Sequence, residues 1–545
     1  VLVQGPPGTG KTSTVVSILN SIHMMEYNEF YESCLRTILG PEGVKCHTPT
    51  ANPQPWLHLV TRLSKQKPHI LVCAPSNVAV DNIIQRIMER GFCDGNGKPY
   101  NPNLLRLGSG KSDKVRAVCM EDLVEQEQLG ALDDNMRVEA LKGVGDKIHE
   151  LVIQLQTTQI LLLNLVSAFK AYPLPRGWEV RVNPESKLPY WVNHNCQTVS
   201  LQPPTVFDLL DPNQSQNNHM VTSNLKLEME SIKVEDYKLS DYEVESLPEY
   251  QVFSGICIQQ IEQLDRLNLF AVRCRARVDP RRYGGMSSVR DIIETSIIDE
   301  AHLVFTTLNG AGHPCLESTT FKISVIDEAG QCVEPSALIA LRRGCKRCIM
   351  VGDPCQLPAT TFSDRAKRAG YDRSLFERLL GAGHPTILLD TQYRMVPQIS
   401  SFPSKTFYGG RLRDGLSVHE KSYLPAYINN GNLHASKFHV DAPVLHPFMF
   451  FDVQSAESQD SMSRFNALEV EVCVKLLKFL ILEAFRINNG TLGPIGIITP
   501  YAEQLSKLRR AFRDSGISSG TQLSALLPMV GTTQSIHQHG LHDLD

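Results

Sequence analysis

The sequence lacks long apolar runs and has no excess of charge of one sign. Its 545 residues contain no stretch of about 18 apolar residues, which argues against a membrane-spanning helix. The formal net charge is −4, from 54 basic and 58 acidic residues, and this balance excludes neither a basic groove nor a nucleic-acid partner. The apolar content of 42% is that of an ordinary globular protein, and the length allows about two to four domains.

The 14 cysteines follow no metal-binding or disulfide pattern. Cys345 and Cys348 form one CxxC, but no second CxxC and no pair of histidines follows at zinc spacing. Cysteines in apolar runs, such as Cys73 and Cys257, favour reduced thiols in the core of an intracellular protein. The first residue is Val1 rather than Met, and no signal peptide precedes it, so we expect a fragment or a partial gene model.

The segment GPPGTGKT, residues 5–12, matches the GxxxxGK[ST] pattern of a phosphate-binding loop. Val1–Gln4 is apolar enough for a buried strand, and we expect a helix from Lys11 to about Met24. The glycines let backbone N–H groups face an anion at the N-terminus of that helix. Lys11 would reach the β and γ phosphates, and Thr12 would give a hydroxyl to Mg²⁺. The loop therefore predicts binding of a nucleoside triphosphate.

Two acidic pairs compete for the role of Mg²⁺ ligand. The stretch SSVRDIIETSIIDEAH has apolar residues near helical spacing, so its Asp299 and Glu300 are interpreted as a solvated helix end. The stretch FKISVIDEAG alternates and stops at Asp327 and Glu328, as a strand that ends beside a phosphate loop does. We therefore assign Asp327 to the metal and Glu328 to polarising the attacking water.

Two further apolar runs end in polar residues suited to the same edge of a sheet. CIMVGDPCQLPAT, residues 348–360, brings Gln356, whose amide can sense a γ-phosphate through a hydrogen bond. TILLD leads into Gln392, Tyr393 and Arg394. An arginine across a cleft from a γ-phosphate accelerates hydrolysis by about 10³- to 10⁵-fold. Taken without the other motifs, however, this segment favours the interpretation that Arg394 is a surface arginine paired with a carboxylate.

The ordered motifs resemble a superfamily one helicase of the Upf-like group. They are GPPGTGKT, APSNVAVD, VFTTLNGAG, IDEAGQ, GDPCQLPAT, DTQYRM and GIITPYAEQ, within residues 1–110 and 286–514. The stretch RCIMVGDPCQLPATTFSDRAKRAGYDRSLFERLL is most similar to senataxin-like helicases. The resemblance implies an α/β fold of two RecA-like P-loop domains, the second incomplete, with ATP in the cleft between them and a helical accessory insertion.

The resemblance and the composition together predict a division of the chain into five segments. The first RecA-like domain would comprise 1–110 and 286–385, and the second would be 386–514. Residues 111–285 would form a helical stalk and accessory insertion with an acidic disordered segment at 227–249, and 515–545 would be an atypical tail. Residues 24–69 are expected to form a surface insertion. The second domain should contain TILLD, FMFFDV and PIGIITP as strands.

The resemblance also implies roles for single residues. ATP would be bound by Gly5, Pro6, Pro7, Gly8, Thr9, Gly10, Lys11 and Thr12. Catalysis would use Lys11, Asp327 as Mg²⁺ ligand, Glu328 as base, Gln356 as γ-phosphate sensor and Arg394 as arginine finger, and Tyr393 would stack on adenine. The backbone of a single strand would contact Pro75, Ser76, Asn77, Thr306, Thr307, Pro500 and Tyr501. A pure helix-capping role for Ser76 and Asn77 stays open.

Two motifs that the family would have after GIITPYAEQLSKLRRAF are missing. One contains a Gln-Gly pair, and the other contains an arginine that contacts the γ-phosphate. Residues 515–545 contain no Arg or Lys, and the adenine-recognising segment expected before Val1 is missing as well. We therefore expect a motor cut at both ends, which as written is weakly active or inactive.

The sequence thus predicts an RNA or DNA helicase driven by hydrolysis of Mg²⁺–ATP. The resemblance implies 5′-to-3′ translocation on single-stranded RNA or DNA, unwinding of RNA–DNA hybrids, and transcription or RNA-processing proteins as partners, without membrane association. It also implies a nuclear location, with the cytoplasm as the alternative. Two other functions stay open, namely an ATP-regulated RNA clamp that does not unwind and a P-loop ATPase that remodels proteins.

Overall fold

The computed structural model divides the chain into two compact units. It describes residues 1–46, 52–108, 112–129, 134–171, 178–182, 189–193, 198–200, 248–419, 450–460, 463–487, 495–515 and 529–532. The sheet unit consists of Val1–Ser21, His69–Leu123 and Leu303–Asp545, and the helical unit of Ile22–Pro68 and Val124–His302. The acidic segment expected at 227–249 lies outside the described residues up to residue 247, as does most of the tail 515–545.

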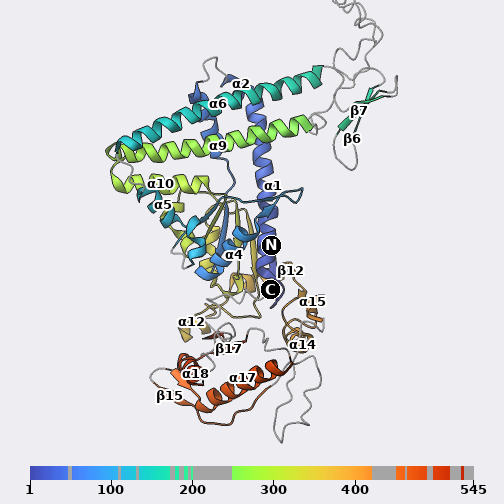
Figure 1. Ribbon diagram of the computed structural model, residues 1–545, viewed down its shortest axis with the longest axis vertical. Helices are drawn as coiled ribbons and strands as arrows, with labels where there is room; N and C mark the ends of the chain where they lie inside the picture. The colour runs from blue at the N-terminus through green and yellow to red at the C-terminus, as the bar shows by residue number, and fades with distance from the viewer. Residues whose placement is uncertain are drawn as a thin grey trace, which may run out of the picture. The chain divides into compact units, whose positions relative to one another are not determined.

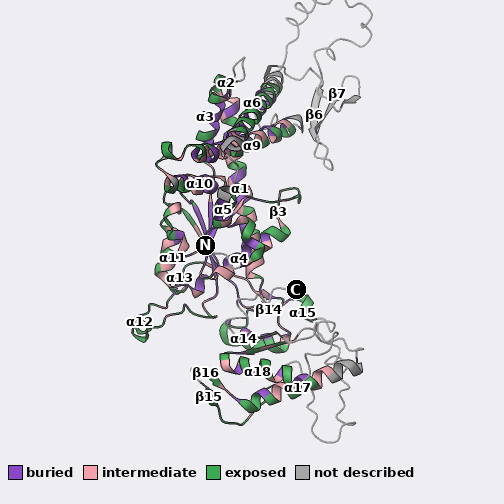
Figure 2. Cartoon of the chain, turned by 60° about the vertical axis from the view of Figure 1, so that its left-hand side comes forward, coloured by how far each residue is buried: buried purple, intermediate pink, exposed green. Residues whose placement is uncertain are grey.

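A seven-stranded parallel sheet forms the centre of the sheet unit (Figure 1). Its strands, in the order β12-β1-β11-β10-β2-β9-β5, are Thr386–Leu388, Leu2–Gln4, Arg347–Gly352, Ile323–Ile326, Ile70–Ala74, Leu303–Thr307 and Leu104–Arg106. All residues of β1, β2 and β10 are buried, as the purple strands in Figure 2 show. Near-continuous apolar runs are typical of parallel strands covered on both faces, and the predicted α/β class is confirmed.

Helices and short segments complete the sheet unit. The helices between and after the strands are α4 (Asn77–Arg90), α11 (Glu334–Leu341), α12 (Asp364–Arg368), α13 (Leu375–Gly381), α14 (Pro397–Phe407), α15 (Leu416–His419), α17 (Ala467–Ile487) and α18 (Ala502–Asp514). Two-stranded pairs are β3 (Phe92–Cys93) with β4 (Pro99–Tyr100), β13 (Thr391–Gln392) with β14 (Arg413–Asp414), β15 (Ser458–Asp460) with β16 (Ser463–Phe465), and β17 (Gly496–Thr499) with β18 (Met529–Thr532).

The strands expected in a second sheet are only partly found there. PIGIITP contains β17, as predicted. TILLD contains β12, which instead pairs in parallel with β1 of the central sheet, from Leu2↔Thr386 to Gln4↔Leu388. The described part of FMFFDV, residues 450–453, is not a strand. An apolar run predicts a strand, but it does not predict which neighbouring strand will form hydrogen bonds with its backbone. The neighbouring strand can come from residues far away in the sequence.

The helical unit is built on two long helices that lie side by side, α6 (Asp134–Ala171) and α9 (Pro248–Val278) (Figure 1). Both helices fall within residues 111–285, the segment expected to form a helical stalk. The other elements of this unit are α2 (Pro41–Lys45), α3 (Pro53–Ser64), α10 (Met286–Glu300) and the antiparallel strands β6 (Trp178–Val182), β7 (Pro189–Asn193) and β8 (Thr198–Ser200). In the described part of the chain, no helix combines the length and apolar character that a bilayer crossing requires.

Two predictions about the first 70 residues are wrong. The first helix, α1, runs from Lys11 to Leu39 and does not end near Met24. Residues 24–69 are not a surface insertion, because they supply buried side chains such as Ile38 and Trp56 to the core of the helical unit. Pro41 begins α2, and Pro53 and Pro55 stand in the first turn of α3, where a missing N–H costs nothing. Among the described residues, two helices are shared between the units. Both α1 and α5 (Met120–Leu129) begin in the sheet unit and end in the helical unit.

Candidate functional site: the C-terminal edge of the parallel sheet

Three predicted motifs meet at one edge of the sheet. Because β1, β11 and β10 are parallel neighbours, the residues that follow them lie side by side. The phosphate loop follows β1, Asp353 follows β11 and Asp327 follows β10. This is the edge at which open α/β sheets bind ligands.

The phosphate loop curls around the side chain of Lys11. The Lys11 ammonium donates to the carbonyl of Gly5 at 3.0 Å and to Oε1 of Gln356 at 3.4 Å. The hydroxyl of Thr9 donates to the carbonyl of Pro6 at 2.7 Å, which closes the turn. Gly8 has a φ of 75°, a left-handed conformation that few side chains tolerate. The loop thus places a cation at the N-terminus of α1, an arrangement suited to a phosphate.

Asp327 is a buried carboxylate with one unsatisfied oxygen. Its side chain is only 4% exposed, and its Oδ1 has no hydrogen-bond partner. Burial and the neighbouring Glu328 raise the pKa of Asp327 to about 7. An unpaired carboxylate oxygen in such a place is costly unless a cation or proton satisfies it. The donor set therefore fits Mg²⁺, which prefers carboxylate and hydroxyl oxygens, and Thr12 in the loop can supply the hydroxyl.

Glu328 has a backbone conformation that is rare for its residue type. Its φ of 49° makes it the one non-glycine residue with positive φ in the described ranges. Such a conformation costs about 1–3 kcal/mol and is concentrated at functional sites. The half-buried side chain accepts a hydrogen bond from Nε2 of Gln331 at 3.1 Å through its Oε2. The strain marks Glu328 as a candidate catalytic residue.

The competing acidic pair lies elsewhere, in the helical unit. Asp299 and Glu300 are the last residues of α10, as predicted. They are not solvated, however, because both are half-buried and Glu300 forms an ion pair of 3.2 Å with Arg273. The carbonyl of Asp299 accepts from the ammonium of Lys67 at 3.2 Å, and burial raises the pKa of the Asp299 carboxyl. The pair stabilises the packing of this helix end.

Asp353 joins several elements at the sheet edge. It is 2% exposed, and its Oδ1 accepts from Nε2 of Gln4 at 3.2 Å and from the backbone of Cys355 at 3.1 Å. Its Oδ2 accepts from Nε2 of Gln356 and from the hydroxyl of Tyr408, both at 2.6 Å. Sequence reasoning missed Gln4 and Tyr408. A polar Gln4 inside the first apolar strand was the available signal.

The DTQYRM turn lies against the phosphate loop. The fully buried Gln392 accepts from the backbone N–H groups of Arg394 at 2.9 Å and Met395 at 2.7 Å. The backbone N–H of Tyr393 donates to the carbonyl of Gly8 at 2.8 Å. A Cβ added to Gly8 would lie 2.7 Å from Cβ of Arg394. Arg394 therefore borders the loop, and the side chains of Tyr393 and Arg394 are both exposed.

The predicted nucleic-acid contacts on the first domain lie at the ends of two neighbouring strands. Pro75, Ser76 and Asn77 follow β2, and Thr306 and Thr307 end β9. The hydroxyl of Ser76 accepts from the backbone of the first turn of α4 at 3.2 Å, so its capping role is real. Thr306 is only 1% exposed and donates to a backbone carbonyl, whereas Thr307 reaches the surface. Thr306 is therefore placed to support this edge from inside rather than to touch a ligand.

A buried arginine that sequence reasoning missed holds this edge in place. Arg106, at the end of β5, is fully buried and pairs with Asp81 of α4 at 2.9 Å. It also donates to Oδ1 of Asn77 at 2.8 Å and to the carbonyl of Leu107. The carbonyl of Leu107 accepts in turn from Thr306 at 3.4 Å. Arg106 thereby connects the two strand ends, and an arginine in the apolar run LLRLG was the signal for it.

Comparison with known proteins decides the family. A model of the AAA domain matches residues 1–241 and 274–364, and a second AAA domain model matches 371–534. The chain is 30% identical over 518 residues to Helicase sen1 of Schizosaccharomyces pombe, covering 94% of the chain and 24% of that protein. The chain belongs to the senataxin-like, Upf1-like helicases of superfamily one. It is also 36% identical over 242 residues to Regulator of nonsense transcripts 1 of Dictyostelium discoideum, covering 44% of the chain and 16% of that protein.

Membership in this family of ATP-hydrolysing helicases agrees with the architecture. The two matched AAA domains indicate two RecA-like domains, and the parallel sheet is the centre of the first. This senataxin-like chain spans less than half the length of the relatives it matches, for example 18% of Helicase SEN1 of Saccharomyces cerevisiae. The predicted domain boundaries stay a proposal. The prediction assigns residues 286–385 to the first RecA-like domain, but α10 at the start of that range belongs to the helical unit.

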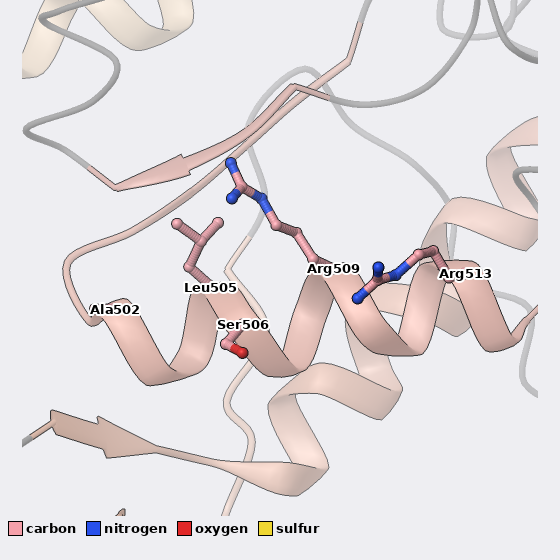
Figure 3. Close-up of a pocket in the computed structure, with 5 residues that line it drawn as sticks. All are labelled: Ala502, Leu505, Ser506, Arg509 and Arg513. Atoms are coloured by element: carbon pink, nitrogen blue, oxygen red, sulfur yellow. The ribbon is translucent and has the colours of Figure 1, made fainter. Parts of the chain in front are cut away.

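The last two predicted contact residues follow a strand of a different sheet. Pro500 and Tyr501 follow β17 and precede α18, and both are exposed. A pocket of about 510 Å³ lies along α18 and is lined by Ala502, Leu505, Ser506, Arg509 and Arg513. Leu505 and Arg509 project from the same side of the helix (Figure 3). Arg509 and Arg513 thus bring two guanidinium groups to this pocket.

Proposed function

We propose that this chain is the motor of an ATP-dependent helicase that moves 5′ to 3′ along single-stranded RNA or DNA and unwinds RNA–DNA hybrids. One observation carries the proposal. The cation of Lys11, the carboxylates of Asp327 and Glu328, the amide of Gln356 and the segment that bears Arg394 all lie at one edge of the parallel sheet. A triphosphate bound there can meet all of them at once.

The phosphate loop, residues 5–12, would bind the phosphates through backbone N–H groups and Lys11. Thr12 and Asp327 would hold Mg²⁺, which when bound neutralises charge on the β- and γ-phosphates. Glu328 would take the proton of the attacking water as the water oxygen bonds to the γ-phosphorus and the bond to the bridging oxygen breaks. Gln356 would orient the γ-phosphate.

Two residues of the DTQYRM turn would act from the other side of the nucleotide. Arg394 would stabilise charge on the transferred phosphoryl group, and Tyr393 would stack on adenine. Both side chains are exposed next to the loop.

The nucleic acid would be held by its backbone rather than by its bases. Pro75, Ser76, Asn77 and Thr307 would contact it on the first domain, with Thr306 as support, and Pro500 and Tyr501 on the second. The guanidinium groups of Arg509 and Arg513 at the α18 pocket would attract the same polyanion. A nuclear location and partners among transcription or RNA-processing proteins are part of this proposal.

The deciding experiment measures ATP hydrolysis by the full chain with and without single-stranded RNA or DNA. We expect hydrolysis to be stimulated by the nucleic acid and to fall at least about hundredfold in Lys11→Ala. If neither RNA nor DNA stimulates hydrolysis, the proposal is overturned in favour of a P-loop ATPase that remodels proteins. A chain that binds RNA in an ATP-dependent way but does not separate a tailed duplex would be a clamp.

The acidic pairs give a matched test of the site assignment. Asp327→Asn with Glu328→Gln should abolish hydrolysis, because both the metal ligand and the base are lost. Asp299→Asn with Glu300→Gln should leave the specific activity of folded protein within about twofold, since these residues lie in the helical unit. Loss of hydrolysis only in the second variant would show that the metal site is elsewhere.

A further inference from the structure

Tyr408 is a buried residue of the sheet edge that the proposed mechanism does not use. It follows α14 directly, its side chain is 3% exposed, and its hydroxyl donates to Oδ2 of Asp353 at 2.6 Å. Burial and the Asp353 carboxylate raise the pKa of Tyr408 well above its ordinary value. The phenol therefore remains a hydrogen-bond donor at any pH at which the protein works.

The same Asp353 oxygen fixes the orientation of Gln356. The two hydrogens of Nε2 of Gln356 are directed to Asp353 at 2.6 Å and to the carbonyl of Gly5 at 3.1 Å. With both donor sites in use, the amide oxygen faces Lys11, whose ammonium is 3.4 Å away. To sense a γ-phosphate, which accepts hydrogen bonds, one N–H of the amide has to leave the carbonyl of Gly5 while the bond to Asp353 holds the amide in place. A continuous chain of hydrogen bonds thus runs from Tyr408 through Asp353 and Gln356 to the phosphate loop.

Tyr408 and Arg394 belong to one internally bonded segment. The carboxylate of Asp414 accepts from Gln392, at the start of this segment, and from Ser400 of α14, both at 2.6 Å. The hydroxyl of Ser404 donates to the carbonyl of Leu412 at 3.1 Å. These bonds tie residues 391–414 together, so Arg394 near one end and Tyr408 directly after α14 belong to one bonded segment.

We propose that Tyr408 is a positioning residue for ATP hydrolysis, which couples the segment that carries Arg394 to the γ-phosphate sensor Gln356 through Asp353. The proposal rests on the role proposed above for Gln356. When the arginine approaches the phosphate, the tyrosine carries the same displacement to Asp353 and to the sensor amide. Without the phenol hydroxyl, the amide is held less firmly at the moment of hydrolysis, while the binding of ATP by the loop is untouched.

The test is Tyr408→Phe in the full chain, with Tyr371→Phe as the matched control because Tyr371 is 51% exposed. We expect Tyr408→Phe to lower the nucleic-acid-stimulated kcat about five- to tenfold, to leave the KM for ATP within about twofold, and to reduce the stimulation by single-stranded RNA. The control should match the unsubstituted chain. An unchanged kcat in Tyr408→Phe, or a fall in kcat that only follows a fall in the folded fraction, would overturn the proposal.

A second variant separates coupling from stability. Asp353→Asn weakens the bonds from both Tyr408 and Gln356, so the double variant Asp353→Asn/Tyr408→Phe should be no slower than Asp353→Asn alone. Additive losses would overturn the coupling. If hydrolysis by the unsubstituted chain does not depend on Lys11, the proposed function fails instead, and the two failures are therefore distinguishable.

Discussion

The backbone N–H of Tyr393 donates to the carbonyl of Gly8 at 2.8 Å, which joins the DTQYRM turn to the phosphate loop. The two segments are almost 400 residues apart in the sequence, yet they meet without an intervening side chain. This contact is what brings an arginine to the border of a triphosphate site. Its existence depends on Gly8, because any Cβ there would enter the turn.

Gly8→Ala should destabilise the chain more than Gly10→Ala. Both glycines have a φ near 75°, so alanine costs about 1 kcal/mol at each from backbone strain. Only at Gly8 would the new Cβ meet Arg394, at 2.7 Å, whereas nothing lies within 4 Å at Gly10. We expect a further loss of about 1–3 kcal/mol in Gly8→Ala from this overpacking. Thermal unfolding without nucleotide measures the difference, and equal melting temperatures would contradict the contact.

Arg106→Met should destabilise the sheet unit by about 3–5 kcal/mol, because it leaves the buried Asp81 without its partner. The loss of the bond to Asn77 should also weaken binding of single-stranded RNA relative to binding of ATP. Urea unfolding and an RNA titration measure the two effects. The matched control is Arg378→Met, whose ion pair with Glu334 is exposed to water and should matter far less. Comparable losses in both variants would refute the special role of the buried pair.

His23 should make the stability of the chain fall as the pH is lowered from about 6.5 to about 4. Burial lowers the pKa of His23 to about 4, and its ring packs on Tyr27 and lies 3.0 Å from the ring nitrogen of His302. In this range the unfolded chain binds a proton that the folded chain excludes, so stability is complete above pH 6.5 and declines below it. The decline attributable to this residue is about 2–3 kcal/mol.

Urea unfolding at several pH values tests the role of His23. His23→Phe keeps the ring packing but has no proton to bind, so its stability should be lower at pH 7 and should change less toward pH 4. The exposed His384, changed to Asn, should leave the slope as it was. An unchanged slope in His23→Phe would mean that another group causes the acid sensitivity.

Local patterns predicted the parts of the site that depend on a few neighbouring residues. The phosphate loop and the strand that stops at Asp327 could be read from short stretches, because apolar runs that end in polar residues mark strand ends. Helical spacing likewise placed Asp299 and Glu300 at the end of a helix. Their partners escaped prediction, since the ion pair with Arg273 joins residues from two helices.

Long-range packing decided the features that prediction missed. The helix after the phosphate loop continues to Leu39 because its second half buries Cys34, Leu35 and Ile38 in a core made largely by later helices. The strand in TILLD joins the central sheet because the free edge of β1 accepts its backbone. Neither outcome is visible in the residues of the segment itself.

By itself the sequence determined which residue types can bind a triphosphate and in what order along the chain they occur, because loop, strand and helix signals act over a few residues. Only the tertiary structure decided that Asp353 joins Gln4, Gln356 and Tyr408, that Arg106 supports Asn77, and that Arg394 borders Gly8. Each of these relationships satisfies a buried polar group or avoids a steric clash between segments distant in sequence. The free energy that selects them comes from burial, which exists only once the sheet has formed.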